Sequence, residues 1–135
     1  MTAWIQTDTF QYVLCNQDSN MFYRVVDLVY TGTAFKVKVV DINLYDYTET
    51  QLEKEIGGFY NLLSDVKRIY RDSWRQIVAE IIAENEAVDS DLTFKNAIDA
   101  AYYMKGIYDI PINEADYLAY DSGVDIEEME TSEAG

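Results

Sequence analysis

The chain lacks histidine altogether and has few of the other residues that build common catalytic or metal sites. Its 135 residues include one cysteine, one proline and 10 lysines and arginines. Without histidine there is no Ser–His or Cys–His catalytic pair and no zinc finger, and one cysteine cannot close an internal disulfide. No apolar run approaches the roughly 18 residues that span a bilayer, and residues 1–18 lack the basic start and apolar centre of a signal peptide. We therefore expect a protein of a reducing compartment, the cytoplasm, with no membrane partner.

Acidic residues are what the chain has in excess. There are 25 Asp and Glu, which give a formal net charge of −15 and a pI near 4.1. Residues 76–135 contain 15 acidic side chains against two bases, Lys95 and Lys105, so they carry −13 of this charge. Because 49% of the residues are apolar and 12 are tyrosine, the chain can still form a core. A field of this sign steers association with a basic partner but does no chemistry by itself.

The first third of the sequence predicts a sheet. Segments rich in β-branched and aromatic residues lie at 10–15, 21–30 and 34–45. Turn signals separate them, and Gly32 can supply a positive φ in the second turn. Apolar and basic residues alternate over 35–39, which is typical of a strand with one buried face. We expect an antiparallel three-stranded meander with helices covering one face.

A capping-box spacing at Thr48 or Thr50 predicts the start of the helical part. Apolar residues then recur every three or four positions, as a helical stripe requires. The stripe consists of Leu52, Ile56, Phe59, Leu63, Val66, Tyr70, Trp74, Ile77 and Ile81. Gly57-Gly58 interrupts it, so we expect helices at about 50–57 and 59–86, or one kinked helix.

Two further helices are predicted beyond this stripe. Thr93 is a suitable N-cap for a helix over 94–105 that ends at Gly106. Pro111 then breaks regular structure, and a short helix is expected over 113–120.

The overall expectation is an α+β fold, in which the N-terminal three-stranded antiparallel meander packs against about four C-terminal α-helices. Residues 1–124 are expected to form a single domain whose acidic helical part starts at about residue 76. Residues 125–135 are expected to be an acidic flexible tail.

Two acidic series are the candidate partner-binding surfaces. The first places five carboxylates in twelve residues, and a helix would space them at roughly 3.6 Å per charge, close to the spacing of about 3.4 Å along one nucleic-acid strand. It consists of Glu80, Glu84, Glu86, Asp89 and Asp91. The alternative is a solvated helix face that keeps the protein soluble.

The second series mixes acids with tyrosines, which can stack on arginine while the acids form ion pairs. The series also includes Glu114 and Tyr108, and its candidate contact residues are Asp109, Asp116, Tyr117, Tyr120, Asp121, Asp125, Glu127 and Glu128. The alternative is that these tyrosines pack the last helices onto the sheet.

The sequence offers little support for a metal or catalytic site. Asp89-x-Asp91 begins like a calcium-binding EF-hand loop, but Phe94 stands where glycine is needed and Ala100 where a bidentate Glu belongs. No motif singles out a catalytic pair among the 25 acids. Cys15 has no histidine to activate it and ends an apolar strand pattern, so we expect a buried structural thiol. No catalytic residue, metal ligand or cofactor is therefore predicted.

A cluster of bases precedes the acidic part. Lys67, Arg68, Arg71 and Arg75 could touch phosphate. We expect them instead to pair with Asp65, Asp72 and the acidic half, because a protein at −15 repels nucleic acid.

The size, the pI, the tyrosine content and the acidic stretches at 80–91 and 109–133 resemble those of small acidic phage proteins that counter bacterial defences, namely DNA-mimic antirestriction proteins and anti-CRISPR proteins. The resemblance is one of type, and no family motif is matched residue by residue. It implies a non-enzymatic inhibitor in the host cytoplasm that occupies the basic nucleic-acid-binding groove of a restriction enzyme or Cas effector without touching nucleic acid.

Two alternatives remain open at this point. The first is a homodimeric assembly protein that uses the stripe from Leu52 to Ile81, with the acids serving only solubility. The second is an enzyme or metal-dependent factor built on an unrecognised cluster of carboxylates.

Overall fold

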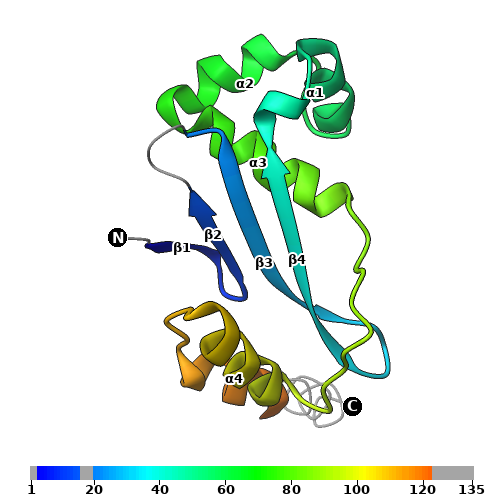
Figure 1. Cartoon of the computed structure of the whole chain (residues 1–135), viewed down its shortest axis with the longest axis vertical. Coiled ribbons are helices and arrows are strands. Elements are labelled where there is room, and N and C mark those ends of the chain that lie inside the picture. Colours follow the sequence, from blue (N-terminus) through cyan, green and yellow to red (C-terminus); the bar gives the residue numbers. More distant parts are fainter. Residues whose placement is uncertain (1–2, 16–19, 123–135) are drawn as a thin grey trace, which may run out of the picture. The chain divides into compact units, whose positions relative to one another are not determined.

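The computed structural model describes residues 3–15 and 20–122 (Figure 1). Their contacts divide them into two compact units. Unit 1 comprises the described residues up to Asp27 together with Lys38–Asp89, and unit 2 comprises Leu28–Val37 together with the described residues from Ser90 onward. The class is α+β, as expected from the sequence.

The sheet has four antiparallel strands, not the three expected. They follow one another in sequence order: β1 (Trp4–Asp8), β2 (Gln11–Cys15), β3 (Phe22–Tyr30) and β4 (Phe35–Asn43). Gly32, between β3 and β4, has the predicted positive φ, at 99°. The first turn expected from the sequence lies largely at 16–19, outside the described residues.

The additional strand is β1, which pairs with β2 so that Trp4 lies opposite Leu14. The register shifts between Gln6 and Asp8, and the Thr7 hydroxyl donates to the Gln11 side chain at 2.7 Å. The strand was not predicted because only two of its residues, Trp4 and Ile5, are apolar. Backbone pairing with β2 holds these residues in a strand, although their side chains show no strand pattern.

The first helix begins where the capping box predicted. In α1 (Glu49–Ile56), the Thr48 hydroxyl accepts from the Gln51 amide at 3.1 Å, and the Gln51 side chain accepts from the Thr48 amide at 2.8 Å. The helix ends at Ile56, so the predicted break at Gly57-Gly58 is confirmed.

The predicted helix over 59–86 is wrong, because the structure divides it in two. The helix α2 (Leu63–Tyr70) starts late because Leu62 is extended, with φ −132°, and the Leu63 amide donates instead to the Glu53 carboxylate at 2.9 Å. A 3₁₀ turn, Arg71–Ser73, then separates α2 from α3 (Trp74–Asn85). Arg71 has a φ of 52°, which no α-helix tolerates.

Helix α3 crosses behind β3 and β4, and α1 and α2 lie at the ends of these strands beside α3 (Figure 1). The buried side chains of these helices and those of the strands form one hydrophobic core. Its buried members are Val13, Tyr23, Val25, Ile42, Leu44, Leu52, Ile56, Leu63, Val66, Val78, Ala79, Ile81, Ile82 and Ala83. Most residues of the predicted stripe are therefore buried or half-buried within unit 1, and few of them are exposed enough to form a dimer interface. Phe59 is the exception, with 59% of its surface exposed.

In unit 2, Phe35 and Phe94 exchange backbone hydrogen bonds of 2.9 and 2.8 Å. This bridge holds Phe94 outside the helix predicted over 94–105, so α4 (Ala97–Tyr108) begins three residues late. Asn96, and not Thr93, is its N-cap.

The other end of α4 also differs from the prediction. Gly106 lies inside the helix, and Asp109 takes the left-handed C-cap conformation with φ 56°. Regular structure is interrupted at Pro111 as predicted, and residues 114–122 form the expected short helix. Ala97, Ala100, Ala101 and Met104 make the buried face of α4.

Candidate partner-binding surface

The first acidic series lies along α3 and the loop after it, and its members differ in exposure. Glu80 is half-buried, and its carboxylate accepts a hydrogen bond from the side-chain amide of Gln76 at 3.2 Å. Burial raises the pKa of the Glu80 carboxyl above its usual range, and the bond from Gln76 opposes this shift. Glu84, by contrast, is exposed. Glu80 is therefore a partly internal group, and Glu84 is the outward-facing acid of the pair.

The acids that follow Glu84 are exposed at the C-terminal end of α3. Glu86 is the C-cap of the helix, and Asp89 lies in the succeeding loop. We call Glu84, Glu86 and Asp89 the α3 acidic end. The helix dipole is negative at this end, and α3 has no basic residue in its last turn, so these charges oppose the dipole. Asp91 is also exposed but belongs to unit 2.

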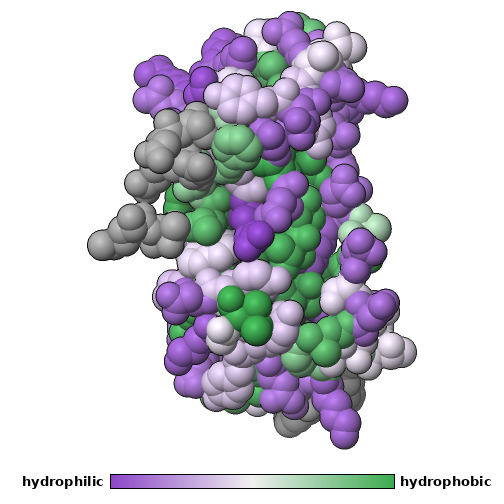
Figure 2. All heavy atoms as spheres, viewed as in Figure 1, coloured by the Kyte–Doolittle hydropathy of each residue, from purple (hydrophilic) through white to green (hydrophobic). Residues whose placement is uncertain are grey.

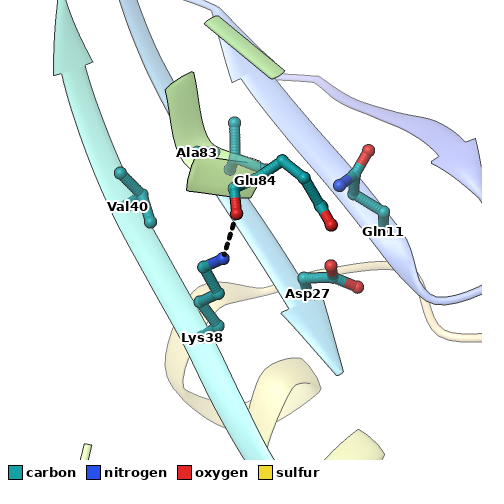
Figure 3. Close-up of a pocket in the computed structure, with 7 residues that line it drawn as sticks. Gln11, Asp27, Lys38, Val40, Ala83 and Glu84 are labelled. Atoms are coloured by element: carbon teal, nitrogen blue, oxygen red, sulfur yellow. Dashed lines mark hydrogen bonds between the residues drawn. The ribbon is translucent and has the colours of Figure 1, made fainter. Parts of the chain in front are cut away.

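A shallow pocket in unit 1 lies beside Glu84. It has a volume of about 170 Å³ and is lined by Gln11, Val25, Asp27, Lys38, Val40, Ala83 and Glu84. Lys38 crosses it and donates to the Glu84 backbone carbonyl at 3.5 Å, while the polar ends of Glu84, Asp27 and Gln11 face the same space (Figure 3). That volume includes open solvent, and the hollow encloses no space large enough for a water molecule, so it is not a typical small-molecule site of about 300 Å³.

In unit 2, two of the predicted contact residues are engaged internally. Tyr117 is fully buried, with 0% of its surface exposed, so its prediction as a partner contact is wrong. The Asp121 carboxylate accepts from the Ala97 and Ile98 amides at 2.7 and 3.1 Å. These amides open α4, where the dipole favours an anion, so Asp121 caps that helix from another segment.

Tyr120 and Asp116 are half-buried, and Asp109 is exposed. The Tyr120 ring meets Phe35 edge-on at 5.5 Å, as the packing alternative expected. The Asn113 amide donates to the Asp116 carboxylate at 3.2 Å. The predicted candidates Asp125, Glu127 and Glu128 lie outside the described residues.

The exposed tyrosine of this surface is Tyr102, which was not among the predicted residues. Half of its surface is accessible, and its hydroxyl donates to the Glu114 carboxylate at 3.0 Å. This bond and the nearby Asp99 charge raise the pKa of Tyr102. We call Asp99, Tyr102 and Glu114 the Tyr102 face. The sequence contained a signal for this exposure, because the alanines at 97, 100 and 101 and Met104 recur at helical spacing, mark the buried side of α4 and leave position 102 outward.

Few of these charges are neutralised within the molecule. In the described part of the chain, the ion pairs are Arg24–Asp41 at 2.6 Å and Arg68–Asp65 at 3.5 Å. The acids of the α3 acidic end and of the Tyr102 face form none. The expectation that the bases at 67–75 pair with nearby acids holds for Arg68 alone. The charges that were predicted to attract a partner are thus available to one.

Cys15 is half-buried, and its thiol lies 3.7 Å from the Asn20 side-chain oxygen. Over residues 3–15 and 20–122, no three Asp, Glu or Cys side chains gather into a group that could hold a metal ion. None of the helices in those ranges has the length and apolarity needed to cross a bilayer. Comparisons of the chain with protein-family models, with curated proteins and with solved structures find no match.

Proposed function

We propose that this protein is a non-enzymatic inhibitor of the anti-CRISPR or antirestriction kind, which presents acidic surfaces to the basic nucleic-acid-binding groove of a bacterial defence nuclease. The observation that carries the proposal is the α3 acidic end. Its three carboxylates are exposed and unpaired, and two of them stand where the helix dipole disfavours a negative charge. Folding stability therefore does not account for them, whereas a basic partner would.

The Tyr102 face supplies the tyrosine that such a surface requires. An exposed ring beside two carboxylates can stack on an arginine guanidinium while the acids pair with it. Tyr102 thus takes the contact role for which the buried Tyr117 is unsuited. The proposal uses each surface by itself and requires no particular arrangement of the two units.

The homodimer alternative has less support. Its interface was to be the helical stripe, and five of the nine stripe residues are at most 7% exposed within unit 1. These are Leu52, Ile56, Leu63, Val66 and Ile81.

The test is capture from a bacterial lysate at about 50 mM salt, where charges act over more than 10 Å. The bait is the full chain in three forms: unmodified, with Glu84→Lys and Glu86→Lys, and with Asp8→Lys and Asp46→Lys. The last is the matched control, since it changes the net charge equally at exposed positions outside both surfaces.

The proposal predicts a nucleic-acid-binding protein that the unmodified and control baits retain, that added DNA or RNA displaces, and that the Glu84/Glu86 variant loses. Equal retention by all three baits, or retention of generic basic proteins alone, would contradict it.

A further inference from the structure

Unit 1 also carries a cluster of four cations within nine residues, Lys67, Arg68, Arg71 and Arg75, and we call it the basic face. These residues lie at the end of α2, in the 3₁₀ turn and in the first turn of α3. The Lys67 ammonium lies 4.7 Å from the Trp74 ring centroid, and the Arg75 guanidinium lies 4.8 Å from it. Two cations are therefore gathered on one indole ring. Hydrophilic side chains cover much of the visible surface of the α1–α2 part of the molecule (Figure 2).

The charges of this face are left uncompensated in a chain with a large excess of acid. Lys67, Arg71 and Arg75 form no ion pair with any described residue. Arg68 pairs with Asp65 at 3.5 Å, and its side chain stays 72% exposed. The position at the C-terminal end of α2 suits Lys67 and Arg68, but Arg75 stands at the positive end of the α3 dipole. Helix stability accordingly explains only part of the cluster.

The backbone conformation at Arg71 is a second feature of the cluster that stability does not explain. Its φ of 52° and ψ of −119° lie outside the regions that a residue with a β-carbon adopts comfortably. Such positions cost on the order of 1–3 kcal/mol and recur at binding sites. Here the strain holds an exposed arginine between Lys67 and Arg75 in the sequence, at the turn that brings α2 against α3.

We infer that the basic face docks a carboxylate-rich segment of a partner protein. Three of its four cations are arginines, whose planar guanidinium pairs with a carboxylate through two hydrogen bonds. A nucleic acid fits less well, because it carries one charge per roughly 1.7 Å of duplex and meets the repulsion of a molecule at −15 over its full length. An acidic segment on a protein of modest net charge is repelled less. The inference does not depend on the proposed function.

The experiment is an NMR titration of the full chain with octaglutamate at about 50 mM salt. The reporter is the indole N–H resonance of Trp74, and that of Trp4 is the internal control, since these are the two tryptophans of the chain. Octathymidylate, of similar charge and length, is titrated in parallel. We expect a saturable shift at Trp74 with the peptide and a weaker response to the oligonucleotide.

Charge variants then locate the site. Arg71→Glu keeps a β-carbon at the strained position and should weaken peptide binding about fivefold or more. Lys105→Glu, in unit 2, makes the same change in net charge and should have little effect. Lys67→Glu is a second variant if Arg71→Glu fails to fold.

Three results would overturn the inference: no shift at Trp74, equal weakening by Lys105→Glu, or tighter binding of the oligonucleotide. Self-association in sedimentation that Arg71→Glu abolishes would assign the face to a second copy and would overturn it too.

Discussion

Removing the Asp121 carboxylate should loosen the start of α4. Asp121 accepts from the Ala97 and Ile98 amides at 2.7 and 3.1 Å, and Asn96 accepts from the Asp99 amide at 3.1 Å. Together they satisfy three of the four amides that a helix N-terminus leaves without a partner. Asp121→Ala exposes two of these amides at a half-buried site.

The size of the effect follows from these contacts. A hydrogen bond to a charged group contributes about 1.5–3 kcal/mol, and a lost N-cap costs about 1 kcal/mol. Since the Asp121 bonds are partly accessible to water and are not additive, we expect a loss of about 2–3 kcal/mol, or about 8–12 °C in Tm. Asn96→Ala, with one bond lost, should cost about 1 kcal/mol.

Two measurements check this prediction. Thermal unfolding gives the change in Tm, and amide hydrogen exchange at Ala97 and Ile98 reports on the start of α4 alone. Asp116→Ala is the matched control, because it removes the same charge from the same helical segment and loses only the contact with Asn113. If Asp121→Ala leaves both amides as protected as the control does, the capping role is refuted. If the capping role is upheld, a charge-reversing substitution at Asp121 would lower stability as well, so it could not test partner binding by itself.

Three further predictions concern stability. The raised pKa of Glu80 means that the folded chain binds this proton more tightly than the unfolded chain, so the free energy of unfolding falls as the pH rises through the folded pKa. In pH-dependent urea unfolding, Glu80→Gln should therefore gain stability at neutral pH and lose that gain below about pH 4, and a gain that does not change with pH would contradict the raised pKa. Arg71→Gly should raise the free energy of unfolding by about 1 kcal/mol, because released strain outweighs the added freedom of the unfolded chain; an unchanged or lower value in denaturant melts would show that φ 52° carries no strain. Tyr117→Ala should cost about 3–5 kcal/mol in the same melts, and a loss below 1 kcal/mol would contradict its full burial.

Local sequence signals predicted most elements of the fold and missed those that depend on distant contacts. The capping box at Thr48 and the break after Ile56 depend on neighbouring residues, and both were predicted. The start of α4 depends on the bridge between Phe35 and Phe94, which are far apart in the sequence. The turn at Arg71 likewise interrupts a stripe whose apolar spacing continues without change from α2 into α3. A hydrophobic period indicates which side of a helix is buried, but it does not show that the chain bends.

The candidate surfaces were predictable in charge and only partly in exposure. The count of acids identified the α3 acidic end, but it could not separate the half-buried Glu80 from the exposed Glu84 one turn later. Among the aromatic residues, the predicted partner contacts were tyrosines close to acidic residues, and both Tyr102 and Tyr117 fit this description. What distinguishes them is burial, since Tyr117 is fully buried and Tyr102 is half exposed.

Helix α3 has charged residues of opposite sign at its two ends, and each sign is the one that the helix dipole disfavours there. Arg75 stands at the positive end of this helix, and Glu84 and Glu86 stand at its negative end. Each placement costs about 0.3–1 kcal/mol at low ionic strength, and the bond from Lys38 to the Glu84 carbonyl offsets only part of it. Basic residues in place of Glu84 and Glu86 would suit the helix dipole without altering the core, whereas an acidic residue in place of Arg75 would also lose the contact with the Trp74 ring at 4.8 Å. A chain whose charges served solubility alone would gain nothing from this arrangement. One helix therefore carries acidic residues at one end and basic residues at the other, both opposed by the helix dipole, as the proposed binding to two oppositely charged surfaces predicts.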